Sequence, residues 1–134
     1  MSVDELRNVP LLSGLTDAGF ERIARCSAEL EASPGQVLAL PGDAPSGAFV
    51  ILDGTVTVEL RGRSIDIGPG EIVGELALLV PDAGRTARVR AATAARCLTL
   101  PREDFLALVE SEPSFALGLL RELAERLVDT HRSG

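Results

Sequence analysis

Polar and apolar residues alternate with a period of about two through the middle of the chain, and with a helical period at both ends. At the start, the pattern predicts helices over residues 3–9 and 16–25, the second with Thr16 as its N-terminal cap and Phe20 and Ile23 on one face. Between residues 28 and 100, short alternating runs are separated by Pro-Gly, Asp-Gly and Arg-Gly turns: AELEA, VLAL, AFVIL, TVTVEL, SIDIG, TARVRA and RCLTL. Many short strands at close spacing predict a sandwich or roll, so the fold class is mainly β with flanking helices.

Two further helices are predicted after the strands, the second opening at Ser114 after Pro113. The last helix has an apolar face wide enough to hold two stripes. One stripe comprises Phe115, Leu119, Leu123 and Leu127, with Thr130 continuing it, and the other comprises Leu117, Leu120, Ala124 and Val128, with His131 continuing it. We expect one stripe to lie over the strands and the other to meet a second copy of the helix.

The segment PGEIVGELALLVPDAGRTA, residues 69–87, combines a turn, a short helix and a guanidinium. Gly74 permits close backbone approach, and the run ELALL is long enough for one or two helical turns whose first N–H groups favour an anion. Arg85 offers the planar fork that matches phosphate oxygens, and Thr86 adds a hydroxyl. Glu75 would repel a simple anion, so it is expected to accept hydrogen bonds from ligand hydroxyls, as a ribose would supply. Phosphate and ribose together indicate a nucleotide.

These residues resemble the phosphate-binding cassette of the cyclic nucleotide-binding domains found in the catabolite activator protein, protein kinase A regulatory subunits and cyclic-nucleotide-gated channels. The chain has VGELALL, the loop VPDAG and then RTARV, and only Val73 departs from the family pattern, where Phe is usual. The upstream turn glycines Gly35, Gly42 and Gly54 also fit the family's antiparallel β-roll, which is jelly-roll-like, a double-stranded β-helix. The resemblance therefore covers nearly the whole chain.

The resemblance implies a role for each cassette residue. Glu75 would receive the ribose 2′-hydroxyl, Arg85 would pair with the equatorial phosphate oxygen, and Thr86 would bond the phosphate or the base. The N–H groups of Leu76 and Ala77 would cap the cyclic phosphate. The complete implied ligand-binding set is Gly74, Glu75, Leu76, Ala77, Arg85, Thr86, Ala87 and, from the last helix, Thr130 at an adenine-contacting position.

Composition limits the remaining possibilities. A chain of 134 residues, 46% hydrophobic, is expected to form one domain: 1–27 N-terminal helices, 28–100 β-roll with the cassette at 69–90, and 101–132 C-terminal helices. The net charge of −7, without a basic stripe, disfavours direct nucleic-acid binding. Without a signal region or a membrane-length apolar run, a cytoplasmic location is expected. Cys26 and Cys97 are expected to be buried thiols with no disulfide between them. All thirteen basic residues are Arg, which points to a GC-rich bacterial source.

Several function classes compete. A cupin-type enzyme would need clustered metal ligands, but the chain has one histidine, His131, so neither an enzyme nor a catalytic cofactor is expected. A transcription regulator would need a helix-turn-helix after the last helix, and a degenerate domain would act only through protein contacts. Glu75 and Arg85 could also form a purely structural ion pair. We expect a sensor domain for cyclic AMP, with cyclic GMP second because Thr86 could bond guanine. It would act on an unknown effector protein, with no effector domain on its own chain and with a possible homodimer.

Overall fold

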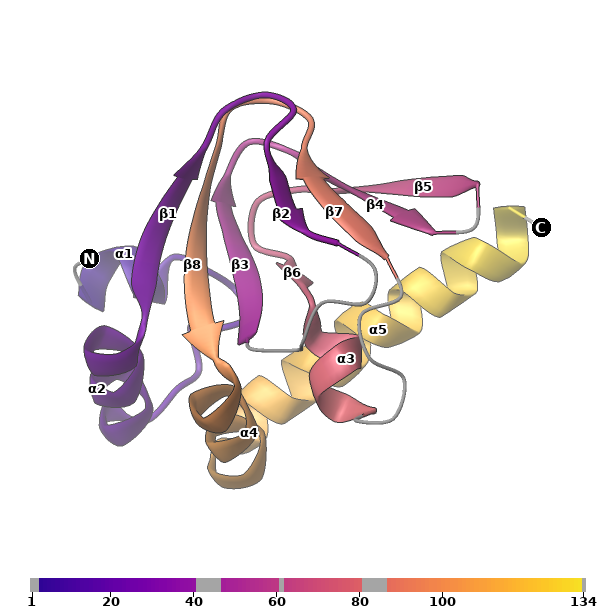
Figure 1. Ribbon diagram of the computed structural model, residues 1–134. Coiled ribbons are helices and arrows are strands. Elements are labelled where there is room, and N and C mark those ends of the chain that lie inside the picture. Colours follow the sequence, from indigo (N-terminus) through magenta and orange to yellow (C-terminus); the bar gives the residue numbers. More distant parts are fainter. Residues whose placement is uncertain (1–2, 41–46, 61, 81–86, 134) are drawn as a thin grey trace.

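Two antiparallel sheets face each other in the computed structural model, which describes residues 3–40, 47–60, 62–80 and 87–133 (Figure 1). The strands are β1 (Ala28–Ala32), β2 (Val37–Ala39), β3 (Gly47–Asp53), β4 (Val56–Leu60), β5 (Arg63–Ile67), β6 (Ile72–Val73), β7 (Arg88–Ala91) and β8 (Ala95–Pro101). The helices are α1 (Val3–Arg7), α2 (Asp17–Cys26), α3 (Glu75–Leu79), α4 (Arg102–Ser111) and α5 (Pro113–Ser133). The prediction of a β-roll with helices before it, one short helix within it and two after it is confirmed.

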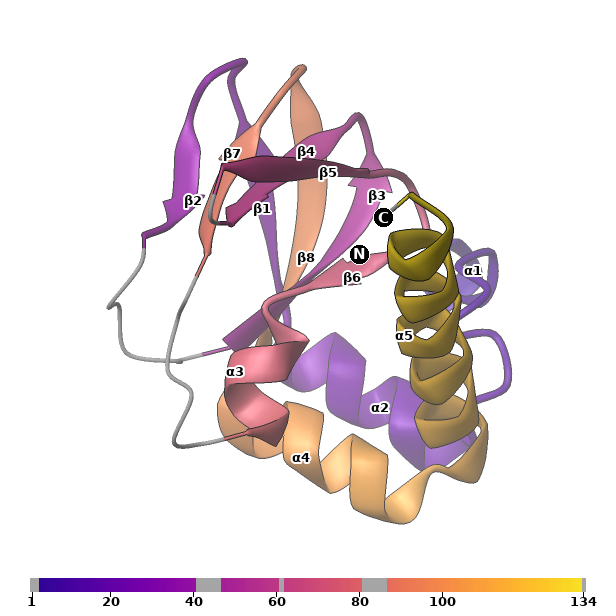
Figure 2. The ribbon, with the colours of Figure 1, turned by 90° about the vertical axis from the view of Figure 1, so that its right-hand side faces the viewer.

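The chain passes back and forth between the sheets at the corners of the roll. One sheet has the order β1-β8-β3-β6 and the other the order β2-β7-β4-β5, so β1 and β2, β3 and β4, β5 and β6, and β7 and β8 each lie in different sheets. Figure 2 looks onto β5 and β4, with β3 and β8 of the other sheet behind them. Backbone hydrogen bonds link neighbouring corners, for example from Gly35 N to the carbonyl of Ala91 at 2.7 Å.

The Asp53-Gly54 turn is one of these corners and not the hairpin turn that its sequence suggests. β3 pairs with β6 and β8, whereas β4 pairs with β5 and β7, so the strands on either side of the turn are not partners. Gly54 has φ +83° and lies so close to another corner that an added Cβ would be 2.2 Å from the carbonyl oxygen of Ala94. The glycine is therefore required both for its backbone conformation and for corner packing.

Alternate residues of the strands divide the apolar core into two parts. Between the sheets lie aliphatic side chains and a thiol, including Ile51, Val73 and Cys97. On the other face of the β1-β8-β3-β6 sheet, Val50, Leu98 and their neighbours pack against the helices. Val73, which replaces the usual Phe, is 2% exposed and packs between the sheets.

The joint between α4 and α5 is fixed to the N-terminal helices. Phe105 and Phe115 meet edge to face with ring centroids 5.8 Å apart, and both are fully buried. The buried carboxylate of Glu112 accepts hydrogen bonds from Thr16 N at 2.8 Å and from Thr16 Oγ1 at 2.7 Å. Thr16 in turn caps α2 as predicted, accepting a hydrogen bond from Gly19 N. The start of α5 is thus held by both apolar and polar contacts.

Two boundary predictions need small corrections. α5 begins at Pro113 and not at Ser114, since proline suits the first position of a helix, where no N–H partner is needed. α1 ends at Arg7, two residues before the predicted end at Val9, and turns follow it.

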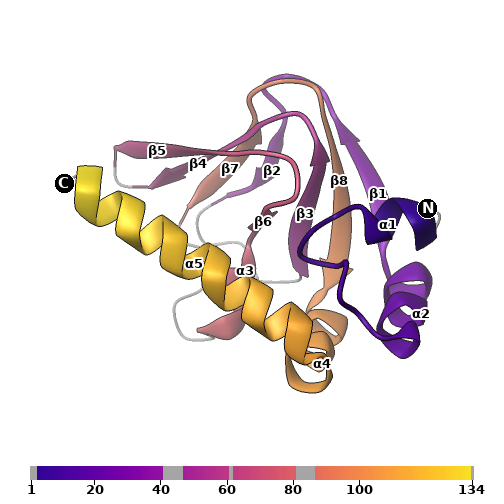
Figure 3. The ribbon, with the colours of Figure 1, turned by 180° about the vertical axis from the view of Figure 1, so that it is seen from behind.

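The two stripes of α5 differ in burial along the helix, which crosses in front of the roll in Figure 3. Phe115 and Leu119 are buried against the roll, with Leu123 partly buried beside them. Leu127 was expected in this stripe but is 60% exposed, because it falls on the outward side. The second stripe faces outward as a whole: Leu117, Leu120, Ala124 and Val128 are exposed.

The thiols of the chain differ in their surroundings. Cys97 is buried in the roll, where burial raises its thiol pKa, whereas Cys26 is half-buried, which corrects the expectation that it is buried. Both are free cysteines, and burial together with the nearby Asp104 also raises the pKa of Cys26.

Among the helices that the structure describes, none combines the length and apolarity required to cross a membrane.

Candidate functional site

The segment from Gly70 to Leu79 turns sharply twice and places a short helix beside the roll. Gly70 and Gly74 have φ values of +87° and +88°, a conformation that glycine adopts without strain. Between them lies β6, a two-residue edge strand that pairs with β3 and was not among the predicted strands. Gly74 is followed at once by α3, so Glu75 is the first residue of this helix.

Glu75 is the most deeply buried acidic side chain of this segment, with 2% of its surface exposed. Its Oε1 accepts a hydrogen bond from Nη1 of Arg126 in α5 at 2.7 Å, across 51 positions of sequence. A carboxylate taken out of water at this depth requires a charged or hydrogen-bonding partner. The last helix supplies that partner.

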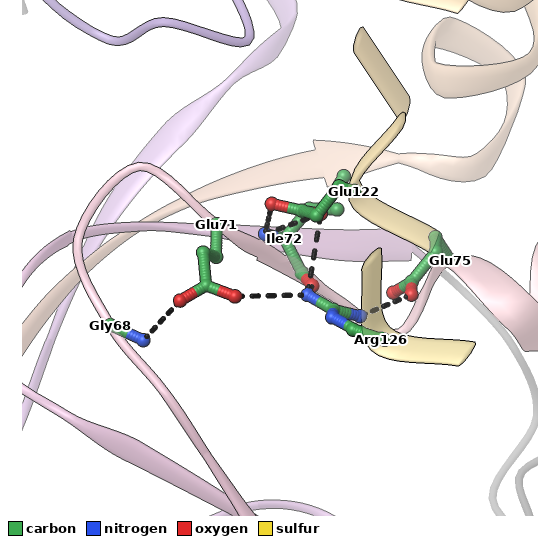
Figure 4. Close-up of polar contacts among 6 residues, drawn as sticks. All are labelled: Gly68, Glu71, Ile72, Glu75, Glu122 and Arg126. Atoms are coloured by element: carbon green, nitrogen blue, oxygen red, sulfur yellow. Dashed lines mark hydrogen bonds and ion pairs between the residues drawn. The ribbon is translucent and has the colours of Figure 1, made fainter. Parts of the chain in front are cut away.

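Arg126 links the Glu75 carboxylate to the edge strand (Figure 4). Its Nη2 donates to the carbonyl oxygen of Ile72 at 2.5 Å and lies 3.3 Å from Glu122 Oε2 and 3.8 Å from Glu71 Oε2. One guanidinium therefore contacts three carboxylates and one backbone carbonyl, which its planar fork of N–H groups permits.

Glu122, one turn before Arg126 in α5, binds the same residue of the edge strand. Its two carboxylate oxygens accept from Ile72 N at 3.3 and 3.2 Å. Burial raises the pKa of Glu122 to about 7, against the smaller lowering effects of Arg126 and of the Ile72 N–H group, and the charges of Glu75 and Glu71 add to the increase.

Sequence reasoning missed both Glu122 and Arg126. A signal was present, because Phe115, Leu119, Glu122 and Arg126 follow one another at intervals of three or four and so share one side of the helix. Two opposite charges continuing a buried stripe indicate polar contacts with whatever the stripe covers. Their partners, Ile72 and Glu75, could not be identified from the helix alone.

The predicted site residues fall into three groups. Gly74 forms the turn before α3 and Glu75 begins that helix. Ala87 is half-buried just before β7. Leu76 and Ala77 belong to the first turn of α3, and Thr130 belongs to α5 one turn beyond Arg126. Arg85 and Thr86, like Gly42, lie outside the described residues. The structure therefore brings Glu75 together with α5. The predicted convergence of Glu75 and Arg85 on one ligand stays a prediction.

Metal-ligating side chains do not gather in the part of the chain that the structure describes. No group of three or more His, Cys, Asp or Glu residues there has a geometry that could hold a metal ion. The carboxylates around Arg126 instead have a guanidinium at their centre.

Comparison with known proteins gives consistent matches. The family model of the cyclic nucleotide-binding domain matches residues 29–112. A putative potassium channel protein of Rhodopseudomonas palustris is 34% identical over 112 residues, which make up 81% of this chain and 27% of that protein. A cyclic nucleotide-gated potassium channel of Rhizobium etli is 33% identical over 118 residues, 88% of this chain and 33% of that protein. The chain thus spans about a quarter to a third of the length of these relatives.

Solved structures show the same fold. A cAMP-binding acyltransferase from Mycobacterium smegmatis superposes with a TM-score of 0.81 at 32% identity, over 95% of this chain and 41% of the other. The catabolite activator protein of Thermus thermophilus gives a TM-score of 0.70 at 30% identity, over 92% of this chain and 61% of the other. With the family model matching more than half of the sequence and the cassette carrying a buried Glu75 at the start of α3, the chain belongs to the cyclic nucleotide-binding domain family.

Proposed function

We propose that this domain is a regulatory sensor that binds cyclic AMP in the roll and signals through α5, with cyclic GMP as the second choice of ligand. The observation that carries the proposal is the position of Glu75: it is buried at the first residue of the cassette helix and held by an arginine from the last helix. The carboxylate proposed to recognise the ligand is thus the one that the signalling helix contacts.

The proposed ligand contacts follow from the chemistry of the cassette. Glu75 accepts the ribose 2′-hydroxyl, Arg85 pairs with the phosphate, and Thr86 bonds the phosphate or the base. The N–H groups of Leu76 and Ala77 cap the phosphate at the start of α3. Gly74 and Ala87 allow close approach on either side, and Thr130 contacts the base from α5.

Ligand binding would affect the position of α5 through the Glu75 carboxylate. Arg126 Nη1 already occupies Oε1 of Glu75, so a ribose hydroxyl arriving there must share the carboxylate with the guanidinium or displace it. Because Arg126 is part of α5, either outcome changes the free energy of the helix position that the structure shows. A ligand that binds one helix position better than another shifts the population between them.

The response to the ligand is proposed to lie in a partner. Relatives of this domain include potassium channels and a cAMP-binding acyltransferase, so the domain occurs beside different effectors. We assign to this domain no catalysis of its own and no direct contact with nucleic acid. Its place would be the cytoplasm, where the ligand is made and degraded.

Calorimetric titration with cyclic AMP and cyclic GMP in parallel tests the proposal. Saturable one-to-one binding, tighter for cyclic AMP, is the expected result. Arg85→Ala should weaken binding by roughly 2 to 5 kcal/mol, because the phosphate charge then lacks its paired cation. Arg88→Ala, an exposed change three residues away, serves as the control. A loss below tenfold for Arg85→Ala contradicts its role, and no binding of either nucleotide contradicts the proposal.

The ribose contact has its own test. Glu75→Ala should weaken cyclic AMP binding strongly and matter far less for the 2′-deoxy analogue, since the hydroxyl is what Glu75 is proposed to accept. Circular dichroism would verify that the variant is folded. Equal losses for both ligands would show that Glu75 acts only by stabilising the fold.

The outward face of α5 is the proposed surface for a second copy of the domain. Leu120 and Leu127 are 64% and 60% exposed, on the side opposite the roll, and an apolar helix face of this width is typical of helix pairing. Light scattering should give the dimer mass for the wild type and the monomer mass for Leu120→Glu. A wild-type monomer with and without nucleotide would rule out this interface.

A further inference from the structure

In the contact between α5 and β6, a helix binds both polar backbone groups of one edge-strand residue. The Glu71 carbonyl accepts from Ile51 N on β3 at 2.8 Å, so the next residue, Ile72, turns its N–H and C=O away from the sheet. Glu122 accepts from the N–H, and Arg126 donates to the C=O. This pair of α5 residues thus replaces a neighbouring strand at Ile72, and we call it the edge clamp.

Three carboxylates share one guanidinium at the edge clamp. The guanidinium of Arg126 is within 4 Å of carboxylates from Glu71, Glu75 and Glu122. The side chains of Arg126 and Glu122 are 21% and 13% exposed, so water screens the repulsion among these carboxylates only in part. Carboxylates crowded in this way favour the uptake of a proton.

We propose that Glu122 makes the docking of α5 on β6 proton-dependent, so that the edge clamp holds the helix more firmly at pH 6 than at pH 8. Glu122 is the carboxylate of the cluster that belongs to α5, so it leaves the cluster when the helix moves away. Glu71 precedes β6 and Glu75 begins α3, and both stay with the roll. Glu122 therefore moves from a largely buried position near other carboxylates into water whenever α5 undocks.

The direction follows from proton linkage. In the docked position the pKa of Glu122 is raised to about 7 by burial, and in water it returns to the ordinary value of 4.5. The docked state thus binds a proton more tightly than the undocked state, and docking weakens as pH rises through about 7. Between pH 6 and pH 8 the two values give a change of about tenfold in the docking equilibrium.

Protonation leaves the rest of the edge clamp in place. The neutral carboxyl group keeps a carbonyl oxygen that accepts from Ile72 N, and Arg126 keeps Glu71 and Glu75 as partners. The proton-dependent docking of α5 takes place in the protein without nucleotide, so it does not depend on the proposed ligand.

Nuclear magnetic resonance on the nucleotide-free protein tests the inference. The side-chain carboxyl carbon of Glu122 is expected to titrate near pH 7, and the Ile72 amide resonance should shift with the same midpoint. In Glu122→Gln, whose amide oxygen still accepts from Ile72 N, the shift of the Ile72 amide near pH 7 should disappear. Glu125→Gln, an exposed change on the same helix, should leave it as in the wild type.

Amide exchange gives the second measurement. After correction for the intrinsic pH dependence of exchange, the Ile72 amide should be about tenfold better protected at pH 6 than at pH 8 in the wild type, and equally protected at both in Glu122→Gln. Titration of Glu122 near pH 4.5 in the wild type overturns the inference. So does an equal change in Ile72 protection with pH in the wild type and in Glu122→Gln.

Discussion

The first two turns of α5 and the turn that carries the edge clamp are held to the rest of the domain by different interactions. At the start of the helix, Phe115 and Leu119 are 0% and 3% exposed, and Phe115 packs edge to face on Phe105. Further along, Glu122 and Arg126 take over the contact with hydrogen bonds and ion pairs to β6 and α3.

The difference indicates which part of the helix can respond to a signal. Apolar burial depends little on pH and has no partner that a nucleotide could replace. The edge clamp, in contrast, is made of groups that a proton or a ribose hydroxyl can engage. We therefore expect the start of α5 to stay fixed while the later turns change position.

The largest effect is expected at the apolar end. Phe115→Ala should lower the free energy of unfolding by about 3–5 kcal/mol, because it leaves a cavity in a fully buried site. Urea denaturation would measure it, and Phe115→Leu, which keeps most of the volume, should lose about 1–2 kcal/mol. A loss as small for alanine as for leucine would mean that the joint is not tightly packed.

At the edge clamp, Arg126→Ala should cost about 2–4 kcal/mol of stability, since it removes the guanidinium from a carboxylate that is 2% exposed. The same urea denaturation would measure it. Arg121→Ala, exposed on the same helix, should change stability by less than about 0.5 kcal/mol and serves as the control. Equal losses of stability for the two variants would show that Arg126 does not hold α5 in place.

A pH effect of intermediate size distinguishes the two parts of the helix. The pKa of Glu122, raised to about 7, lies above its ordinary value of 4.5, so the stability that it contributes is complete below pH 4.5 and is lost as pH rises through 7. We expect the wild type to lose about 1 kcal/mol between pH 6 and pH 8 relative to Glu122→Gln. Phe115→Leu should keep the wild-type pH dependence. Parallel curves for the wild type and Glu122→Gln would contradict the prediction.

The smallest effect is expected on the outward face. Leu127→Ala should change the unfolding free energy by less than about 0.5 kcal/mol in the monomer, because the side chain is 60% exposed. Urea denaturation at several protein concentrations would measure it. A larger loss that grows with protein concentration would instead place Leu127 in an interface between two copies.

Much of the fold could be predicted from local patterns. The alternating runs became strands, ELALL became α3, and Thr16 caps α2 as its side chain suggested. The exceptions have physical causes. Asp53-Gly54 has the chemistry of a hairpin turn, but whether the strands beside a turn pair with each other depends on the sheets that they join. β6 has two residues, too few to show an alternating pattern.

The candidate site could be predicted only in part. The position of Glu75 after Gly74 marked it as a hydroxyl acceptor, and the structure places it at the start of α3 as expected. Arg126 as its partner was not predicted, because the cassette residues were interpreted through their contacts with a ligand. Two residues 51 positions apart carry no local sign that they meet.

The sequence by itself determined which segments form strands and helices, and which segment resembles the cassette, because alternation, turn residues and helix starts are properties of neighbouring residues. The tertiary structure alone decided which sheet each strand joins, which face of α5 is buried, and which arginine reaches Glu75. These depend on how the roll closes, and closing brings together groups whose mutual burial no local pattern records.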